Sequence, residues 1–241
     1  MRSYALTDIG KKREDNEDFV FCSEEPVGCL PNLFIVADGM GGHNAGDFAS
    51  RFCVEEFTAL LREKKEKTVY STLEAVFREM NGKLIQQAKE RSELEGMGTT
   101  FVMAYVQDGV LHVANIGDSR LYLVRSEIEQ ITMDHSLVAE MVRNGEINEE
   151  MARFHPNKNI VTRAVSTNGI VAPDFYEVPL KQNDTFLMCS DGLYSMVENQ
   201  EIFDIIKNYP SDEQGACEEL VERANKNGGK DNISVIIVSL K

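Results

Sequence analysis

Six short apolar runs rich in β-branched residues constrain the fold of this chain more than any other feature. They are LFIVA (33 to 37), TTFVMAYV (99 to 106), VLHVANI (110 to 116), RLYLV (120 to 124), TFLMCS (185 to 190) and ISVIIVSL (233 to 240). Runs of this kind predict strands, and because the apolar stretch is continuous in several of them, those strands should be covered on both faces. The turn signals QDG (107 to 109) and GDS (117 to 119) predict that the middle three runs form an antiparallel meander.

Three segments have the apolar spacing of amphipathic helices. They are 45 to 65, 70 to 92 and 212 to 227. The first two precede the meander and the third precedes the last strand, so helices and strands are segregated along the chain. This order predicts an α+β fold of antiparallel sheets and helix layers rather than a parallel βαβ sheet.

Residues 132 to 172 interrupt this pattern. The segment mixes charged residues with NG at 144 to 145 and HPNKN at 155 to 159, and its helical periodicity around 136 to 143 is weak. A connection of this length inside a compact domain is usually functional or mobile.

Composition narrows the class of protein. The 241 residues lack a Pro-, Gly- or Ser-rich linker, which predicts one domain over residues 1–241. The formal net charge of -15 disfavours partners such as nucleic acid or anionic membranes. The chain shows no secretory signal, no apolar stretch that would span a bilayer and no CxxC pair among five cysteines, so we expect a cytoplasmic protein with reduced thiols.

Aspartates stand at the ends of three of the most apolar runs. Asp38 follows FIVA, Asp191 follows FLMCS and Asp231 precedes the final strand. Any one of them could be an ordinary Asp-Gly or loop residue. If the three strand ends converge, however, their carboxylates would repel one another at the edge of the core, and a cation would have to lie between them.

The ligand types indicate which cation this would be. Carboxylate and carbonyl oxygens select Mg²⁺ or Mn²⁺, and no His or Cys cluster has the spacing of a zinc site. Gly39 would let its carbonyl approach the metal, and Gly41 and Gly42 would leave room for water or substrate.

Two further clusters are candidates for the same site. In REDNED, Arg13 offers a guanidinium fork suited to phosphate, and Glu17 and Asp18 could hold metal-bound waters, although the stretch alone reads as a solvated charge run. Asp118 lies in the turn IGDSR, which is equally compatible with a simple tight hairpin.

Six motifs follow one another along essentially the whole chain. They are RxxxED (Arg13 to Asp18), DGMGG (Asp38 to Gly42), GMGTT (Gly96 to Thr100), ANIGDSR (Ala114 to Arg120), SDGL (Ser190 to Leu193) and GGKDNIS (Gly228 to Ser234). In content and order they resemble the metal-dependent Ser/Thr protein phosphatases of type 2C, the PPM family, particularly its compact bacterial members. The resemblance implies two antiparallel β-sheets between helix layers, with a two-metal centre at one end.

The resemblance also implies roles for individual residues. Asp38 would bridge two Mn²⁺ or Mg²⁺ ions, the Gly39 carbonyl would bind one, and Asp191 and Asp231 would bind the other. Asp118 would share a third, weaker metal with Asp191.

The remaining carried-over roles concern substrate and water. Arg13 looks like the phosphate clamp, and Glu17 and Asp18 look like residues that hold the metal-bound waters. Residues 134 to about 165 look like the flap segment that influences substrate choice.

One position departs from the animal members of the family. Where they usually carry a histidine that serves as the proton donor, this chain has Met40, which cannot donate a proton. His43 could take that role, and a metal-bound water is an equally good candidate.

The implied activity is hydrolysis of phosphoserine and phosphothreonine on proteins by a metal-activated water, without a phosphoenzyme. Nucleophilic alternatives are weak, because Ser190 lies in no GxSxG elbow and Cys189 lacks a CxxxxxR loop. The partners implied are phosphorylated proteins and an opposing Ser/Thr kinase, and we expect a monomer. Two alternatives are a phosphatase dedicated to one regulatory target and a catalytically inactive module that binds phosphoproteins.

Overall fold

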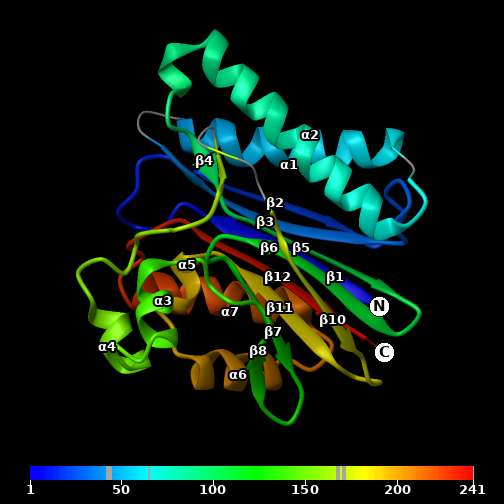
Figure 1. The fold of residues 1–241 in the computed structure, drawn as a ribbon. Coiled ribbons are helices and arrows are strands. Elements are labelled where there is room, and N and C mark those ends of the chain that lie inside the picture. Colours follow the sequence, from blue (N-terminus) through cyan, green and yellow to red (C-terminus); the bar gives the residue numbers. More distant parts are fainter. Residues whose placement is uncertain (42–44, 65, 167–168, 170–171, 241) are drawn as a thin grey trace.

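A five-stranded antiparallel sheet forms one half of the fold. The computed structural model describes residues 1–41, 45–64, 66–166, 169 and 172–240. The strands of the first sheet, in spatial order, are β1 (Arg2–Asp8), β12 (Ile233–Ser239), β11 (Thr185–Cys189), β7 (Arg120–Val124) and β8 (Ile128–Gln130). The first and last long strands of the chain are therefore neighbours, as Figure 1 shows.

The second sheet packs against the first. Its order is β10 (Asp174–Pro179), β6 (Val110–Ile116), β5 (Phe101–Gln107), β3 (Leu33–Met40), β4 (Gly98–Thr99) and β9 (Val165–Ser166), with β2 (Asp18–Ser23) also paired to β3. Every ladder in both sheets is antiparallel. The predicted α+β sandwich of two antiparallel sheets is thus confirmed.

Helices cover the outer face of each sheet. The helices α1 (Ala45–Glu63) and α2 (Val69–Glu90) lie on the second sheet, and α6 (Asn199–Asn208) and α7 (Glu213–Lys226) lie on the first (Figure 1). All three helices that the sequence predicted are present, with ends that differ from the prediction by at most two residues. The shorter helices α3 (Leu137–Arg143), α4 (Glu149–Phe154), α5 (Asp191–Tyr194) and the 3-10 turn η1 (Ser92–Leu94) complete the described elements.

The double covering explains why the central strands read as unbroken apolar runs. In β3, Phe34 and Val36 face the other sheet, whereas Ile35 and Ala37 face the α1–α2 layer. Alternate residues of one strand therefore enter two different cores. Between the sheets, the rings of Phe34 and Phe186 meet edge to face at 5.8 Å.

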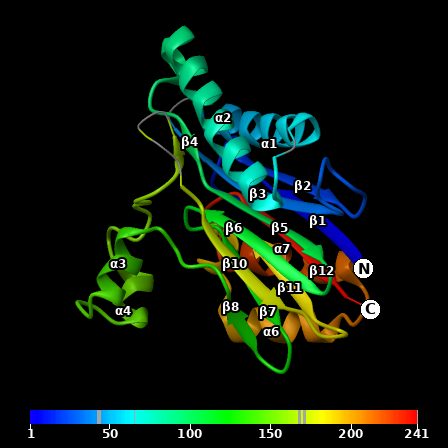
Figure 2. The same cartoon turned by 45° about the vertical axis from the view of Figure 1, so that its right-hand side comes forward.

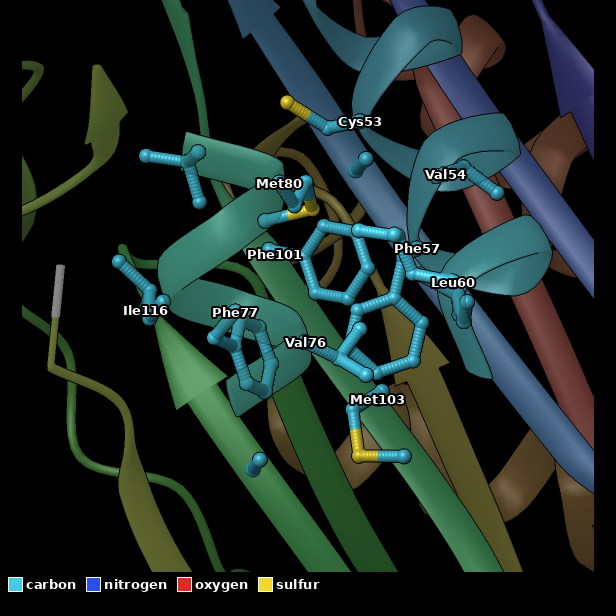
Figure 3. Packing of buried hydrophobic residues seen from close by; sticks show 14 of the residues in the cluster. Cys53, Val54, Phe57, Leu60, Val76, Phe77, Met80, Phe101, Met103 and Ile116 are labelled. Carbon is cyan, nitrogen blue, oxygen red and sulfur yellow. The ribbon is translucent and has the colours of Figure 1, made fainter. Parts of the chain in front are cut away.

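The core under α1 and α2 is built around aromatic rings (Figure 3). Phe57 of α1 lies 4.9 Å from the Phe77 ring of α2 and 5.1 Å from the Phe101 ring of β5. Met80 and Met103 lie beside these rings in the same cluster. Because all five side chains are almost fully buried, they fix both helices to the sheet.

The predicted three-stranded meander is only half right. The strands β5 and β6 pair over residues 101–107 and 110–116, but β7 pairs with β11 and β8 in the other sheet. The GDS turn therefore crosses from one sheet to the other. Its geometry differs from that of a hairpin: Gly117 has φ +109, and a Cβ there would lie 2.6 Å from the Thr100 side chain.

The irregular segment 132 to 172 contains two short helices that project beyond the sheets (Figure 2). The helix α3, near the weak periodicity noted in the sequence, begins at the N-cap Ser136, and α4 begins at the N-cap Asn148. No residue of α4 is buried, and Phe154 is 81% exposed. In the part of the chain that the structure describes, no helix combines the length and apolar character that crossing a bilayer requires.

Candidate metal centre

The register of β2 on β3 places two aspartates opposite each other. Asp18 pairs with Asp38 across the ladder. The Asp38 backbone is held from the other side, because its N–H donates to Thr100 Oγ1 at 2.9 Å and its carbonyl accepts from the Thr100 N–H at 2.8 Å. Asp38 is thus fixed inside the strand, two residues before its end, rather than in a flexible turn.

Asp191 reaches the same region from the first sheet, at the start of α5 directly after β11. Ser190 connects the two sheets through hydrogen bonds. Its hydroxyl donates to Asp18 Oδ2 at 2.7 Å and accepts from the Ser234 N–H at 3.0 Å. One buried serine therefore ties β11 and β12 to the aspartate of β2.

Asp231 stands immediately before β12, beside the buried Asn232. The Asn232 amide donates to the carbonyls of Ile9 and Asp15, each at 2.9 Å, and its oxygen accepts from the Glu17 N–H at 2.9 Å. Asn232 therefore holds the loop that carries Arg13 and Glu17 against Asp231.

The predicted phosphate clamp lies at this edge. Arg13 Nη2 is 2.8 Å from Asp231 Oδ2, and Nη1 is 3.4 Å from Glu17 Oε2. Partial burial works against the charged form, but the hydrogen bond to Asp231 and the nearby carboxylates raise the pKa of Arg13 above its usual value. The Arg13 side chain is still 45% exposed, so it is accessible to a ligand from solvent.

Asp118 lies in the turn that leads from β6 to β7. Its carbonyl accepts from the Tyr194 hydroxyl at 3.0 Å, and Tyr194 ends the helix that Asp191 begins. The Tyr194 ring is covered by the Arg120 guanidinium at 3.6 Å, and Arg120 in turn makes a bidentate ion pair with Asp134. Asp118 and Asp191 are therefore linked through one aromatic side chain.

Burial and mutual repulsion shift the pKa values of these acids in one direction. Burial, with the charges of Asp191 and Asp231, raises the pKa of Asp18 to about 7 even though Ser190 donates to it. Burial and the neighbouring carboxylates raise the pKa of Asp118 to about 7, that of Asp191 to about 6, and that of Asp38 well above its usual value. The protein alone thus disfavours the charge that these carboxylates carry at neutral pH.

Two of the buried oxygen atoms also lack an internal partner. Asp18 Oδ1 and Asp191 Oδ1 accept no hydrogen bond from any described residue. A buried carboxylate oxygen without a donor is costly, and a bound cation would remove both this cost and the repulsion. The donor set, carboxylates and carbonyls without histidine or cysteine, fits Mg²⁺ or Mn²⁺.

The carboxylates nevertheless do not yet form a closed ligand cluster. Within the described ranges, no three His, Cys, Asp or Glu side chains converge closely enough to hold an ion.

Gly39 is required for packing as well as for its proposed ligand role. A Cβ at this position would lie 2.1 Å from the Gly46 carbonyl oxygen and 2.6 Å from that of Glu17. Glycine therefore lets β3, the start of α1 and the Glu17 loop meet closely. Gly192 is similar, because a Cβ there would lie 1.9 Å from the Asn232 carbonyl oxygen.

The proposed proton donor His43 lies outside the described residues, as does Gly42. Met40 is the last residue of β3 and pairs with Gly98. The alternative nucleophiles have structural roles: Ser190 is an internal hydrogen-bond donor, and burial raises the pKa of Cys189 to about 12, which keeps its thiol protonated.

The histidines outside the motifs do not gather at the centre. His135 anchors the flap segment, because its Nδ1 accepts from the Gly117 N–H at 3.0 Å and its Nε2 lies 2.9 Å from Asp174. His112 lies beside Tyr105 on the second sheet, and His155 ends α4.

Sequence reasoning missed Asn232, Tyr194 and the bridging role of Ser190. Asn232 and Ser190 each stand next to a predicted aspartate within a motif, which was the available signal. A polar residue that is buried beside a charged site and satisfies several backbone groups is a candidate for organising it.

The model of the family described as "Protein phosphatase 2C" matches residues 3–233. The chain belongs to the protein phosphatase 2C family. It is accordingly a metal-dependent Ser/Thr protein phosphatase, a hydrolase.

Relatives of this 2C phosphatase are similar over nearly their whole length. It is 41% identical to the "Serine/threonine phosphatase stp" of Listeria innocua, covering 99% of this chain and 95% of the relative. It is 38% identical to "Protein phosphatase PhpP" of Streptococcus pneumoniae, covering 98% and 96%.

Solved structures agree with the fold. The Ser/Thr phosphatase Stp1 of Staphylococcus aureus matches with a TM-score of 0.91 and 34% identity over 99% of this chain and 94% of that one. The catalytic domain of the phosphatase PstP, solved with two manganese ions, matches with a TM-score of 0.85 and 32% identity over 100% and 98%.

Proposed function

We propose that this 2C phosphatase hydrolyses phosphoserine and phosphothreonine on proteins with two Mn²⁺ or Mg²⁺ ions and opposes a Ser/Thr kinase in the cytoplasm. The observation that carries the proposal is the group of buried aspartates whose pKa values are raised together and whose oxygen atoms are in part unpartnered. Without a cation, burial and mutual repulsion disfavour the charged forms of these carboxylates.

The proposed ligand roles follow the elements that hold each residue. Asp38 on β3 would bridge the two ions, the Gly39 carbonyl would bind one, and Asp191 and Asp231 from the other sheet would bind the second. Asp118, linked to Asp191 through Tyr194, would share a weaker third ion with it.

Glu17 and Asp18 would hold the waters of the centre. Asp18 is fixed by Ser190, and Glu17 lies against Gly46 at the start of α1, where a Cβ on Gly46 would lie 2.4 Å from Glu17 Oε1. The bound ions would supply Lewis-acid stabilisation and an activated water for attack on phosphorus.

Arg13 would bind the phosphate. In the structure its guanidinium is satisfied by Asp231 and Glu17, so these carboxylates keep it oriented at the edge of the site. With Asp231 bound to a metal ion and Glu17 to water, the exposed Arg13 guanidinium would be able to pair with the equatorial oxygens of a phosphoryl group. The planar guanidinium matches the geometry of these oxygens.

His43 would donate the proton to the leaving oxygen, since Met40 cannot perform this step. A proton from a metal-bound water is the equally good alternative.

The flap segment, about 134 to 165, would contact the protein that carries the phosphate. Its exposed Phe154 and Met151 offer apolar surface of the kind that protein partners cover. We also propose that residues 1–241 act as a single catalytic domain and as a monomer.

The deciding experiment is hydrolysis of a phosphothreonine peptide with Mn²⁺, with EDTA, and in Asp38→Asn. Activity should require both the metal and Asp38, while circular dichroism shows an intact fold in the variant. Full activity of Asp38→Asn would refute the two-metal assignment. If wild-type protein bound the phosphopeptide but released no phosphate with any divalent metal, the chain would instead be a phosphoprotein-binding module.

A further inference from the structure

An aromatic groove opens on the outer face of the second sheet, where the first turn of α2 meets β5, β6 and β10. Figure 2 shows these three strands side by side below α2. The groove has a volume of about 410 Å³. Its main lining residues are Tyr70, Leu73, Met103, Tyr105, His112 and Phe175.

Paired rings form the walls of the aromatic groove. Tyr70 of α2 and Phe175 of β10 lie 4.5 Å apart, and Tyr105 of β5 stacks on His112 of β6 at 4.6 Å with an angle of 8°. Tyr70 is 52% exposed although it adjoins the apolar core. An exposed aromatic ring next to further rings is typical of a surface that a partner covers.

The charged side chains around the aromatic groove are acidic. Asp108 and Glu177 line it, and Glu74 lies beside Tyr70 at its edge. Glu177 is 75% exposed and lies 3.4 Å from the His112 ring nitrogen. No lysine or arginine lines the groove, and every lining residue belongs to the described part of the chain.

We propose that the aromatic groove docks a linear basic segment of the phosphoproteins on which this enzyme acts. An arginine or lysine can lie over the exposed Tyr70 ring while Glu177 or Asp108 pairs with its charge. A neighbouring apolar residue of the peptide can pack against the Tyr70 and Phe175 rings, above the buried Leu73 and Met103. The acidic rim selects this occupant over a purely apolar one.

The aromatic groove lies at a distance from the candidate metal centre. Thr100, which is hydrogen-bonded to Asp38, directly precedes β5. Tyr105 lies five residues farther along this extended strand, about 17 Å away. A substrate would therefore carry its basic segment at least about five extended residues from the phosphorylated side chain. This substrate role rests on the proposed function, whereas binding of a basic peptide does not.

Binding is tested first, in EDTA and without any phosphate. The probe is a short unphosphorylated peptide that carries Arg-Arg-Leu, compared with the same peptide carrying Glu-Glu-Leu. Isotope-labelled methionine methyl groups provide the readout, because Met103 lines the groove while Met188 lies between the sheets as an internal control. The basic peptide should shift the Met103 signal and leave Met188 unchanged.

Variants then separate the groove from general charge attraction. Tyr70→Ala and Glu177→Lys should each weaken binding at least about fivefold, and Tyr70→Phe should retain it. Glu222→Lys, at an exposed site on α7, changes the net charge by the same amount as Glu177→Lys and should change binding less than about twofold.

Three results would overturn the docking site: no shift of Met103, an equal response to the acidic peptide, or an equal loss in Glu222→Lys and Glu177→Lys. A Met103 shift that depends on protein concentration alone would assign the face to self-association and would likewise reject the proposal.

The substrate role is tested with phosphothreonine peptides that do or do not carry the distant Arg-Arg-Leu segment. The segment should lower KM at least about fivefold without changing kcat, and Glu177→Lys should abolish this advantage while hydrolysis of a small aryl phosphate stays unchanged. Binding without any KM advantage would refute the substrate role but leave the phosphatase assignment intact.

Discussion

Replacing Asn232 with alanine would release the loop that carries Arg13 from the start of β12. The buried Asn232 side chain makes three hydrogen bonds, to the carbonyls of Ile9 and Asp15 and from the Glu17 N–H, each at 2.9 Å. At about 0.5–1.5 kcal/mol for each bond, the variant should lose about 2–4 kcal/mol of unfolding free energy. For a chain of this size, that loss corresponds to a melting temperature lower by about 5–15 °C.

Urea denaturation in EDTA measures this difference without a stabilising contribution from bound metal. Asn227→Ala is the matched control, because the side chain of the exposed Asn227 makes a single hydrogen bond, to the Met196 carbonyl at 2.8 Å. We expect that control to lose about 1 kcal/mol or less. If Asn232→Ala unfolded no more readily than Asn227→Ala, Asn232 would not organise the site in the way that its contacts indicate.

Two further predictions concern a partly buried ion pair and the proton donor. Asp184 accepts from Arg125 Nη2 at 2.8 Å, and although burial opposes it, this pairing lowers the pKa of Asp184. Its contribution is therefore complete above its unfolded pKa of about 4 and lost as pH falls through the lower folded value. Asp184→Asn should be about 1–3 kcal/mol less stable at pH 7 in urea denaturation, and a gap that did not shrink at about pH 3 would contradict the assignment. For the donor, His43→Gln should lower kcat and shift the basic limb of its pH profile, with rescue by Met40→His, whereas an unchanged profile would favour water.

The strands that are covered on both faces could be predicted from the sequence, because burial on both faces requires a continuous run of apolar residues. The runs at 110 to 116 and 120 to 124 coincide with β6 and β7, residue for residue. The strands β1 and β10 were not recognised, since most of their residues are only partly buried and polar residues interrupt them. The β2 strand was hidden behind the charged REDNED stretch, although it carries Asp18 into the site.

The assignment of strands to sheets was a different problem. A turn signal such as GDS states that the chain reverses, but it does not state whether the next strand stays in the same sheet. Here β7 joins β11 because its alternate residues fill the cores on both sides of the first sheet, Leu121 and Leu123 toward the second sheet and Tyr122 and Val124 toward α6 and α7. Such a choice depends on side chains distant in sequence.

The sequence by itself determined the family, the types of strand and helix, and the aspartates at or near the ends of the buried strands. These features are local, because each is set by the composition and spacing of a few neighbouring residues. Only the tertiary structure decided that Asp18 faces Asp38, that Ser190 and Asn232 join the two sheets to the Arg13 loop, and that aromatic rings from α2, β5, β6 and β10 form one groove. These relations depend on strand register and on packing between distant segments, and no short stretch of sequence encodes either.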